Sequence, residues 1–168
     1  MNVGNVAEGR GLLVIGYGNT MRRDDGVGVR AAELLAHDPR VSDARILARY
    51  QLVPELALDI GGSSLVVFID ADMRGLPGSI DIQPIEAGQP RPEADGAAGR
   101  GAFSHHVGPG ELMALAAELS GSRPAAVAIG IGVADADAGE GLTPAVEASL
   151  PRVADVVADL VAQRRSGP

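Results

Sequence analysis

The most constraining feature of the sequence is an apolar run that passes directly into a glycine-rich turn. Residues 12–15 are aliphatic, and the motif GYGNTMRRDDGVG follows at residues 16–28. Within this motif the turn ends in two adjacent carboxylates, Asp24 and Asp25, and a helical pattern begins at Val27. This order predicts a buried strand that delivers a loop to a functional site, as in the first unit of an α/β protein.

Composition limits the chemistry that the chain can perform. Its 168 residues suffice for one domain, and with 46% hydrophobic but only 2% aromatic residues the core must be aliphatic. The chain has no cysteine, which excludes disulfides, thiolate metal sites and a cysteine nucleophile. All 14 basic residues are arginine, which excludes Schiff-base chemistry and a P-loop lysine. A net charge of −8 argues against nucleic acid and anionic membranes as partners.

Strands and helical patterns alternate along the chain, which predicts a single-domain α/β fold with a mostly parallel sheet and helices on both faces. Strands are expected at 12–15, 45–50, 65–69, 79–84 and 125–131. Helices are expected to begin at Val27, Pro54, Pro109 and Thr143-Pro144, and Pro151 should kink the closing helix or end a first segment of it.

The predicted domain covers residues 11–163, with flexible ends at 1–10 and 164–168. No segment is long enough to span a membrane, and no signal peptide is evident, so a cytoplasmic protein is expected. Residues 87–101 lack periodicity and are predicted to form a long mobile loop with a functional role.

Three polar side chains are predicted to meet at one edge of the sheet. Asp25 follows the first strand, Asp70 ends the strand at 65–69, and His105 precedes the helix that begins at Pro109. Ligands of α/β sheets bind beyond the carboxyl ends of the strands. Two carboxylates and an imidazole suit a divalent metal such as Zn²⁺ or Ni²⁺ with open coordination positions.

Each candidate also has a simpler interpretation. Asp24 is best explained as a cap of the first helix, whereas Asp25, taken alone, fits capping and metal ligation equally well. Asp72 is expected to be solvated. The adjacent His105 and His106 fit polar surface, but their place before a helix favours a ligand role.

Other polar residues are given structural roles. His37 is expected to cap the end of the first helix. The Arg22-Arg23 pair is expected to be solvated, with a substrate carboxylate as the functional alternative.

Two other active-site types fit poorly. Gly16-Tyr17-Gly18 supplies two glycines of a dinucleotide fingerprint, but Met21 replaces the third and the acidic residues would repel a pyrophosphate. A serine hydrolase based on Ser104 and His105 lacks the Gly-x-Ser-x-Gly elbow, and adjacent residues seldom form a nucleophile–base pair.

The motif at 16–28 resembles the opening signature of the hydrogenase maturation proteases, the endopeptidases that trim the C-terminus of the [NiFe]-hydrogenase large subunit. The resemblance covers nearly the whole chain. Its further motifs are QLVPEL at 51–56, FIDA at 68–71, SHHVGP at 104–109, GIG at 130–132 and GLTP at 141–144.

The resemblance implies a three-layer α/β/α sandwich and three metal-contacting residues, Asp25, Asp70 and His105, with His106 as the alternate to His105. Relatives often carry Glu at the position of Asp25, so the Asp25 side chain is one methylene shorter than theirs. It further implies that nickel arrives in the large-subunit precursor and is contacted by these residues, with zinc or cadmium as surrogates in vitro. Asp25 and Asp70 are the implied catalytic residues, acting either through metal-activated water or with a carboxylate as general base.

The implied partner is the [NiFe]-hydrogenase large-subunit precursor, and a monomer is expected. A non-catalytic nickel checkpoint module for the same precursor is the alternative, which a missing ligand would favour. A general metallopeptidase would need a preformed site, and its His-Glu-x-x-His signature is absent.

Overall fold

The computed structural model describes residues 11–88 and 107–166. The strands of this part of the chain are β1 (Leu12–Tyr17), β2 (Arg45–Arg49), β3 (Leu65–Asp72), β4 (Ile80–Pro84) and β5 (Ala125–Gly132). The α-helices there are α1 (Val27–Leu35), α2 (Leu56–Gly61), α3 (Pro109–Ser120), α4 (Pro144–Glu147) and α5 (Leu150–Arg165). Two short 3₁₀ helices in the same part are η1 (Arg23–Gly26) and η2 (Pro39–Val41).

The strands form one sheet of order β2-β1-β3-β5-β4. β1, β2, β3 and β5 pair in parallel, and β4 lies antiparallel at the edge beside β5. The register of β1 and β3 places Ile15 opposite Phe68 and Gly16 opposite Ile69. The mostly parallel sheet is therefore confirmed. β4 matches the strand expected at 79–84, and its edge position suits Pro84, because proline has no N–H to donate to a second neighbouring strand.

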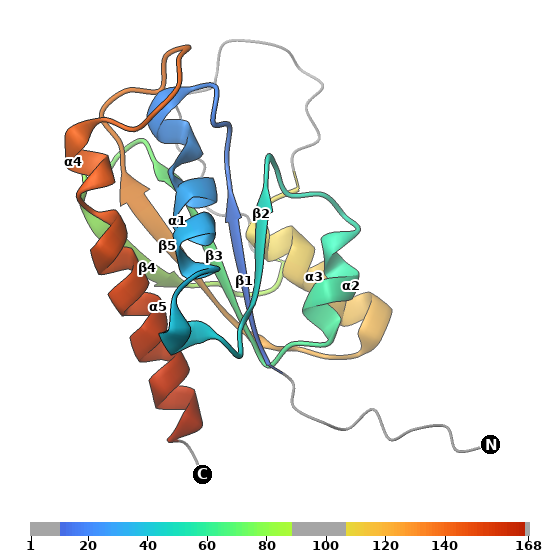
Figure 1. The fold of residues 1–168 in the computed structure, drawn as a ribbon. Coiled ribbons are helices and arrows are strands. Elements are labelled where there is room, and N and C mark those ends of the chain that lie inside the picture. The colour runs from blue at the N-terminus through green and yellow to red at the C-terminus, as the bar shows by residue number, and fades with distance from the viewer. Residues whose placement is uncertain (1–10, 89–106, 167–168) are drawn as a thin grey trace.

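Helices cover both faces of the sheet, which gives the three-layer α/β/α sandwich that the sequence predicts. Figure 1 shows α1 and α5 on one side and α2 and α3 on the other. Alternate side chains of β1 pack on opposite faces of the sheet. Val14 packs in the layer of α1 and α5, and Ile15 packs in the layer of α2 and α3. Aliphatic side chains dominate both layers, with Phe68 buried in the second. Within the described ranges, no helix has the length and apolar character needed to cross a membrane.

Several predicted details are wrong because periodicity identifies a helical face but not its width. Leu34, Leu58 and Leu119 fit the apolar period of α1, α2 and α3, and we expect such residues to be buried, yet they are 41%, 71% and 58% exposed. The strand predicted to stop before Asp70 continues to Asp72, because pairing with β5 extends to Gly132.

The chain's C-terminal part follows one of the two predicted outcomes. Pro151 lies in the first turn of α5, so the pattern divides into α4 and α5 rather than one kinked helix. α5 includes Arg164 and Arg165, which the sequence assigns to a flexible tail. Arg165 there contacts Asp43, with Nη2 and Oδ1 2.6 Å apart.

The glycines of the opening motif allow α1 to approach β1 and β3 closely. A Cβ on Gly28 would overlap the carbonyl oxygens of Ile69 and Tyr17, and one on Gly16 would overlap the carbonyl oxygen of Gly28. Gly18 has φ +141°, a backbone conformation that favours glycine. The glycines thus serve helix–strand contact at the end of β1.

We expect Gly28→Ala to lower the free energy of unfolding by about 2–3 kcal/mol, because the added methyl group must displace backbone atoms of two strands. Urea denaturation measures this change. Gly62→Ala is the matched control, since its Cβ would meet only the Asp59 carbonyl oxygen at 3.9 Å. Equal free energies of unfolding for Gly28→Ala and Gly62→Ala would contradict the role of Gly28 in close packing of α1 against the strands.

Candidate functional site

The structure brings Asp25 and Asp70 to the same edge of the sheet. Asp25 lies in η1, which follows the carboxyl end of β1, and Asp70 lies near the carboxyl end of β3. β1 and β3 are adjacent parallel strands, and η1 contacts β3 directly. This is the edge at which α/β sheets bind ligands.

Asp25 is half-buried, and its carboxylate does not cap α1. The N-cap of α1 is Gly26, and no side chain accepts a hydrogen bond there. Instead the backbone N–H of Asn19 donates to Oδ2 of Asp25 at 3.2 Å. Asp25 therefore makes no hydrogen-bonded cap of α1, and its carboxylate accepts a hydrogen bond from the loop after β1 instead.

Asp70 and Asp72 both lie in the last part of β3. Asp70 is half-buried, and the N–H of Ala71 donates to its Oδ1 at 2.7 Å. The prediction that Asp72 is solvated is wrong, since its side chain is only 13% exposed. Its Oδ1 accepts a hydrogen bond from the N–H of Arg74 at 3.0 Å, which turns the chain after β3.

The predicted third ligand lies outside the described residues. His105 and its alternate His106 belong to the segment 89–106, as do Ser104 and most of the predicted loop at 87–101. Across residues 11–88 and 107–166, no group of three or more His, Cys, Asp or Glu side chains is placed to hold a metal ion. The three-residue metal contact therefore stays a prediction.

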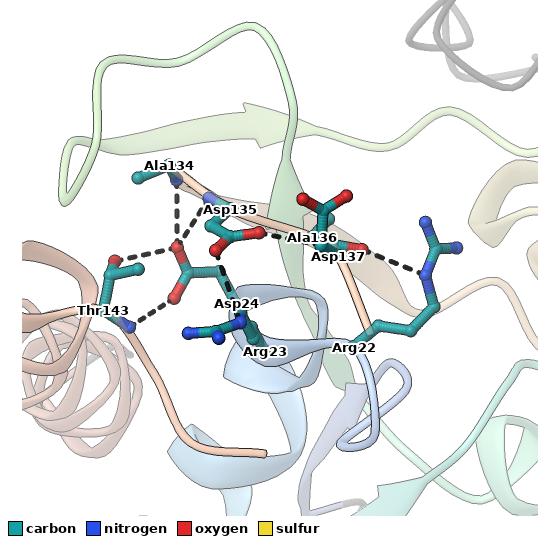
Figure 2. Close-up of polar contacts among 8 residues, drawn as sticks. All are labelled: Arg22, Arg23, Asp24, Ala134, Asp135, Ala136, Asp137 and Thr143. Atoms are coloured by element: carbon teal, nitrogen blue, oxygen red, sulfur yellow. Dashed lines mark hydrogen bonds and ion pairs between the residues drawn. The ribbon is translucent and has the colours of Figure 1, made fainter. Parts of the chain in front are cut away.

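Asp24 has a role that the sequence did not predict. Its side chain is fully buried, and its carboxylate accepts hydrogen bonds from the loop between β5 and α4 rather than capping a helix. The N–H groups of Ala134 and Asp135 donate to Oδ2 at 3.0 and 3.1 Å. The N–H of Thr143 donates to Oδ1 at 2.6 Å, and its hydroxyl donates to Oδ2 at 2.8 Å (Figure 2).

This geometry corrects the expectation that Asp24 caps the first helix. Thr143 is the N-cap residue of α4 and is followed by Pro144, but its hydroxyl donates to Asp24 instead of capping the helix. The two residues are 119 positions apart, so local capping rules could not pair them. A signal existed, because both belong to motifs that carry the family resemblance. His37, by contrast, places Nδ1 3.0 Å from the Glu33 carbonyl oxygen, as expected of a cap at the end of α1.

Backbone contacts reinforce the Asp24 anchor. Met21 and Arg23 exchange backbone hydrogen bonds with Gly139, each at 2.9 Å. Arg22 and Arg23 are exposed, as predicted, but both also contact the same loop: Arg22 Nε donates to the Ala136 carbonyl at 3.1 Å, and Arg23 Nε lies 3.3 Å from Asp135 Oδ2 (Figure 2).

Arg23 has φ +44°, in the left-handed region, which costs a non-glycine residue about 1–2 kcal/mol. The contacts with the 134–143 loop hold Arg23 in that conformation. The contacts of Arg23 and Asp24 with this loop thus fix the backbone between Arg22 and Asp25.

Asp24 is held in its charged form. Burial by itself would raise the pKa of Asp24, but the hydrogen bonds from Thr143, Ala134 and Asp135 outweigh burial and lower the pKa below the ordinary 3.8. A buried carboxylate that is so fully hydrogen-bonded stabilises the folded state whenever it is ionised.

Solved structures of hydrogenase maturation proteases share this fold. The HycI protease from Thermococcus kodakarensis matches with a TM-score of 0.70 and 23% identity, over 93% of this chain and 95% of that one. The maturating endopeptidase HybD from E. coli matches with a TM-score of 0.68 and 25% identity, over 94% of each chain. No protein-family model matches the chain, and no curated protein matches it by sequence.

These structures confirm the family resemblance that the sequence motifs predict. The chain has the α/β/α fold of the hydrogenase maturation proteases over nearly its full described length. The compared proteins are proteases, in agreement with the hydrolase activity that the motifs predict.

We expect Asp24→Asn to lower the free energy of unfolding by on the order of 3 kcal/mol at pH 7, because the amide nitrogen would face N–H and O–H donors where a carboxylate oxygen now accepts. Urea denaturation measures the change. Asp159→Asn, an exposed substitution on α5, should change it by less than about 0.5 kcal/mol. Equal effects of the two substitutions would contradict the anchor role.

The Asp24 contribution should also depend on pH. Because the pKa of Asp24 is lowered by folding, its stabilisation is fully present above the unfolded value of about 3.8 and is lost as pH falls through the lower folded value. The stability difference between the wild type and Asp24→Asn should therefore stay constant from pH 6 to about pH 4 and shrink as the pH falls below about 3.8, as measured by denaturation at each pH. A difference that stays constant below about pH 3.8 as well would show that Asp24 is not the titrating group.

Proposed function

We propose that this chain, which shares the fold of the hydrogenase maturation proteases, is an endopeptidase that removes the C-terminal peptide from the nickel-loaded precursor of a [NiFe]-hydrogenase large subunit. The observation that carries the proposal is the placement of Asp25 and Asp70 at the carboxyl edge of adjacent parallel strands in this fold. The T. kodakarensis HycI protein and the E. coli HybD protein are described as hydrogenase maturation enzymes, which supports the assignment.

Nickel enters the proposal as part of the substrate. Asp25 and Asp70, together with His105 or its alternate His106, would contact the nickel ion that the precursor carries. Carboxylate and imidazole ligands suit a divalent ion of this kind. Contact with an ion that the precursor brings would restrict the reaction to precursors that have already received their metal.

Peptide hydrolysis needs a base for the attacking water and stabilisation of the charge that develops on the carbonyl oxygen. Asp25 and Asp70 are the carboxylates that we place at the reacting bond, and either can accept the proton of the water. The nickel ion of the precursor would supply positive charge that stabilises the developing oxyanion. The Asp24 anchor contributes by fixing the backbone on which Asp25 stands.

The remaining partners follow from the same proposal. The large-subunit precursor is the macromolecular partner, met in the cytoplasm by a monomeric enzyme. A net charge of −8 disfavours nucleic acid as a second partner.

The direct test incubates the purified protein with nickel-loaded and nickel-free precursor and measures precursor mass by mass spectrometry. We expect the nickel-loaded precursor alone to lose a C-terminal peptide. Binding without loss of mass would contradict the peptidase and support a checkpoint module, whereas equal cleavage of both precursors would contradict nickel recognition.

Substitution identifies the residues responsible. Asp25→Ala and Asp70→Ala should each reduce the cleavage rate by at least about a hundredfold, because each removes a group from the reacting centre. His105→Ala and His106→Ala are compared in parallel, and loss of cleavage in only one of them identifies the contacting imidazole. Asp81→Asn is the control, since Asp81 is exposed on β4 and accepts a hydrogen bond from Gln83.

A further inference from the structure

Asn19 connects the candidate carboxylate with the exposed side chain of Tyr50 and with the backbone of Met21, on the same edge of the sheet. Its backbone N–H donates to Asp25 Oδ2 at 3.2 Å. Its side-chain Nδ2 donates to the hydroxyl of Tyr50 at 2.8 Å, and its Oδ1 accepts from the N–H of Met21 at 2.9 Å. Asp25, Met21 and Tyr50 are therefore held in one hydrogen-bonded group that spans the ends of β1 and β2.

Tyr50 and Met21 expose large apolar surfaces at this place. Tyr50 is 64% exposed and Met21 is 58% exposed. The chain has only two tyrosines and two phenylalanines. One of these four aromatic rings is therefore exposed at the residue that Asn19 connects to Asp25. Tyrosine and methionine are both enriched in the buried centres of protein–protein interfaces.

The hydrogen bond from Asn19 also limits the positions that the Tyr50 ring can take. A side chain that is already held in place loses less conformational entropy when a partner packs against it. The same Asn19 residue fixes Asp25, so the ring and the carboxylate are positioned relative to each other. This arrangement suits recognition of a partner that reaches both.

We propose that Tyr50 and Met21 bind an apolar side chain of the precursor peptide, close to the bond that is cleaved. This inference rests on the proposed function, because the peptide is what brings its backbone to Asp25. An extended peptide advances by about 3.3 Å per residue, so a side chain one or two residues from the cleaved bond lies within reach of a group joined to Asp25 through one residue. The phenol ring and the thioether offer it apolar contact.

The test measures cleavage of the nickel-loaded precursor at varied concentrations by Tyr50→Ser, Tyr50→Phe, Met21→Ser and the wild type. We expect Tyr50→Ser to raise KM roughly tenfold with kcat little changed, since the contact aids binding rather than chemistry. Met21→Ser should raise KM by a smaller factor, and Tyr50→Phe, which keeps the ring, should raise it least. Leu58→Ser, on the 71% exposed Leu58 of α2, is the control and should leave both constants unchanged.

A second comparison locates the partner side chain. Apolar residues of the precursor on either side of the cleaved bond are replaced one at a time by serine. One of these replacements should raise KM for the wild type but not raise it further for Tyr50→Ser, because the two changes remove the same contact.

The outcomes separate this inference from the proposed function. Cleavage by the wild type with an unchanged KM in Tyr50→Ser and Met21→Ser would overturn the inference and leave the peptidase intact. So would a fall in kcat at constant KM, which would place Tyr50 in the chemistry. Failure of the wild type to cleave would overturn the proposed function and this inference with it.

Discussion

The buried carboxylate of Asp24 is the contact on which the candidate site depends. A fully buried charge is stable only when hydrogen bonds replace its water, and here the donors all come from the loop that joins β5 to α4. Asp25 is the next residue in the same short helix, so the backbone that positions the anchor also positions the candidate catalytic group. Stability of the fold and geometry of the site are therefore coupled through one residue.

The glycines of the opening motif complete this arrangement. Gly16 and Gly28 let α1 lie against the ends of β1 and β3, which places η1 against β3 and Asp25 at the same edge as Asp70. The spacing of Gly16 and Gly18 is partly that of a dinucleotide-binding turn, because both kinds of site need the backbone to approach closely. Here that approach is made by the chain's own strands and helix. Of the two adjacent carboxylates, Asp24 is a buried anchor and Asp25 is the candidate catalytic group.

Much of the fold could be predicted from the sequence, because its strands are aliphatic runs bounded by glycine, proline or polar residues. Placement of Asp25 and Asp70 at one edge followed from the parallel topology alone. The contact between Asp24 and Thr143 could not be predicted from local capping rules, since it joins residues 119 positions apart, although both residues lie in motifs that carry the family resemblance. Nor could the exposure of Leu58, which fits the helical period of α2 but extends beyond the covered face.

The central claim is that the carboxylates at this edge contact nickel carried by the precursor. Nickel K-edge X-ray absorption tests it most directly, on the precursor alone and on its complex with the chain frozen before turnover. We expect additional oxygen and nitrogen ligands to nickel in the wild-type complex, and fewer of them with Asp25→Ala or Asp70→Ala. Identical nickel spectra for the precursor alone and the wild-type complex would contradict it.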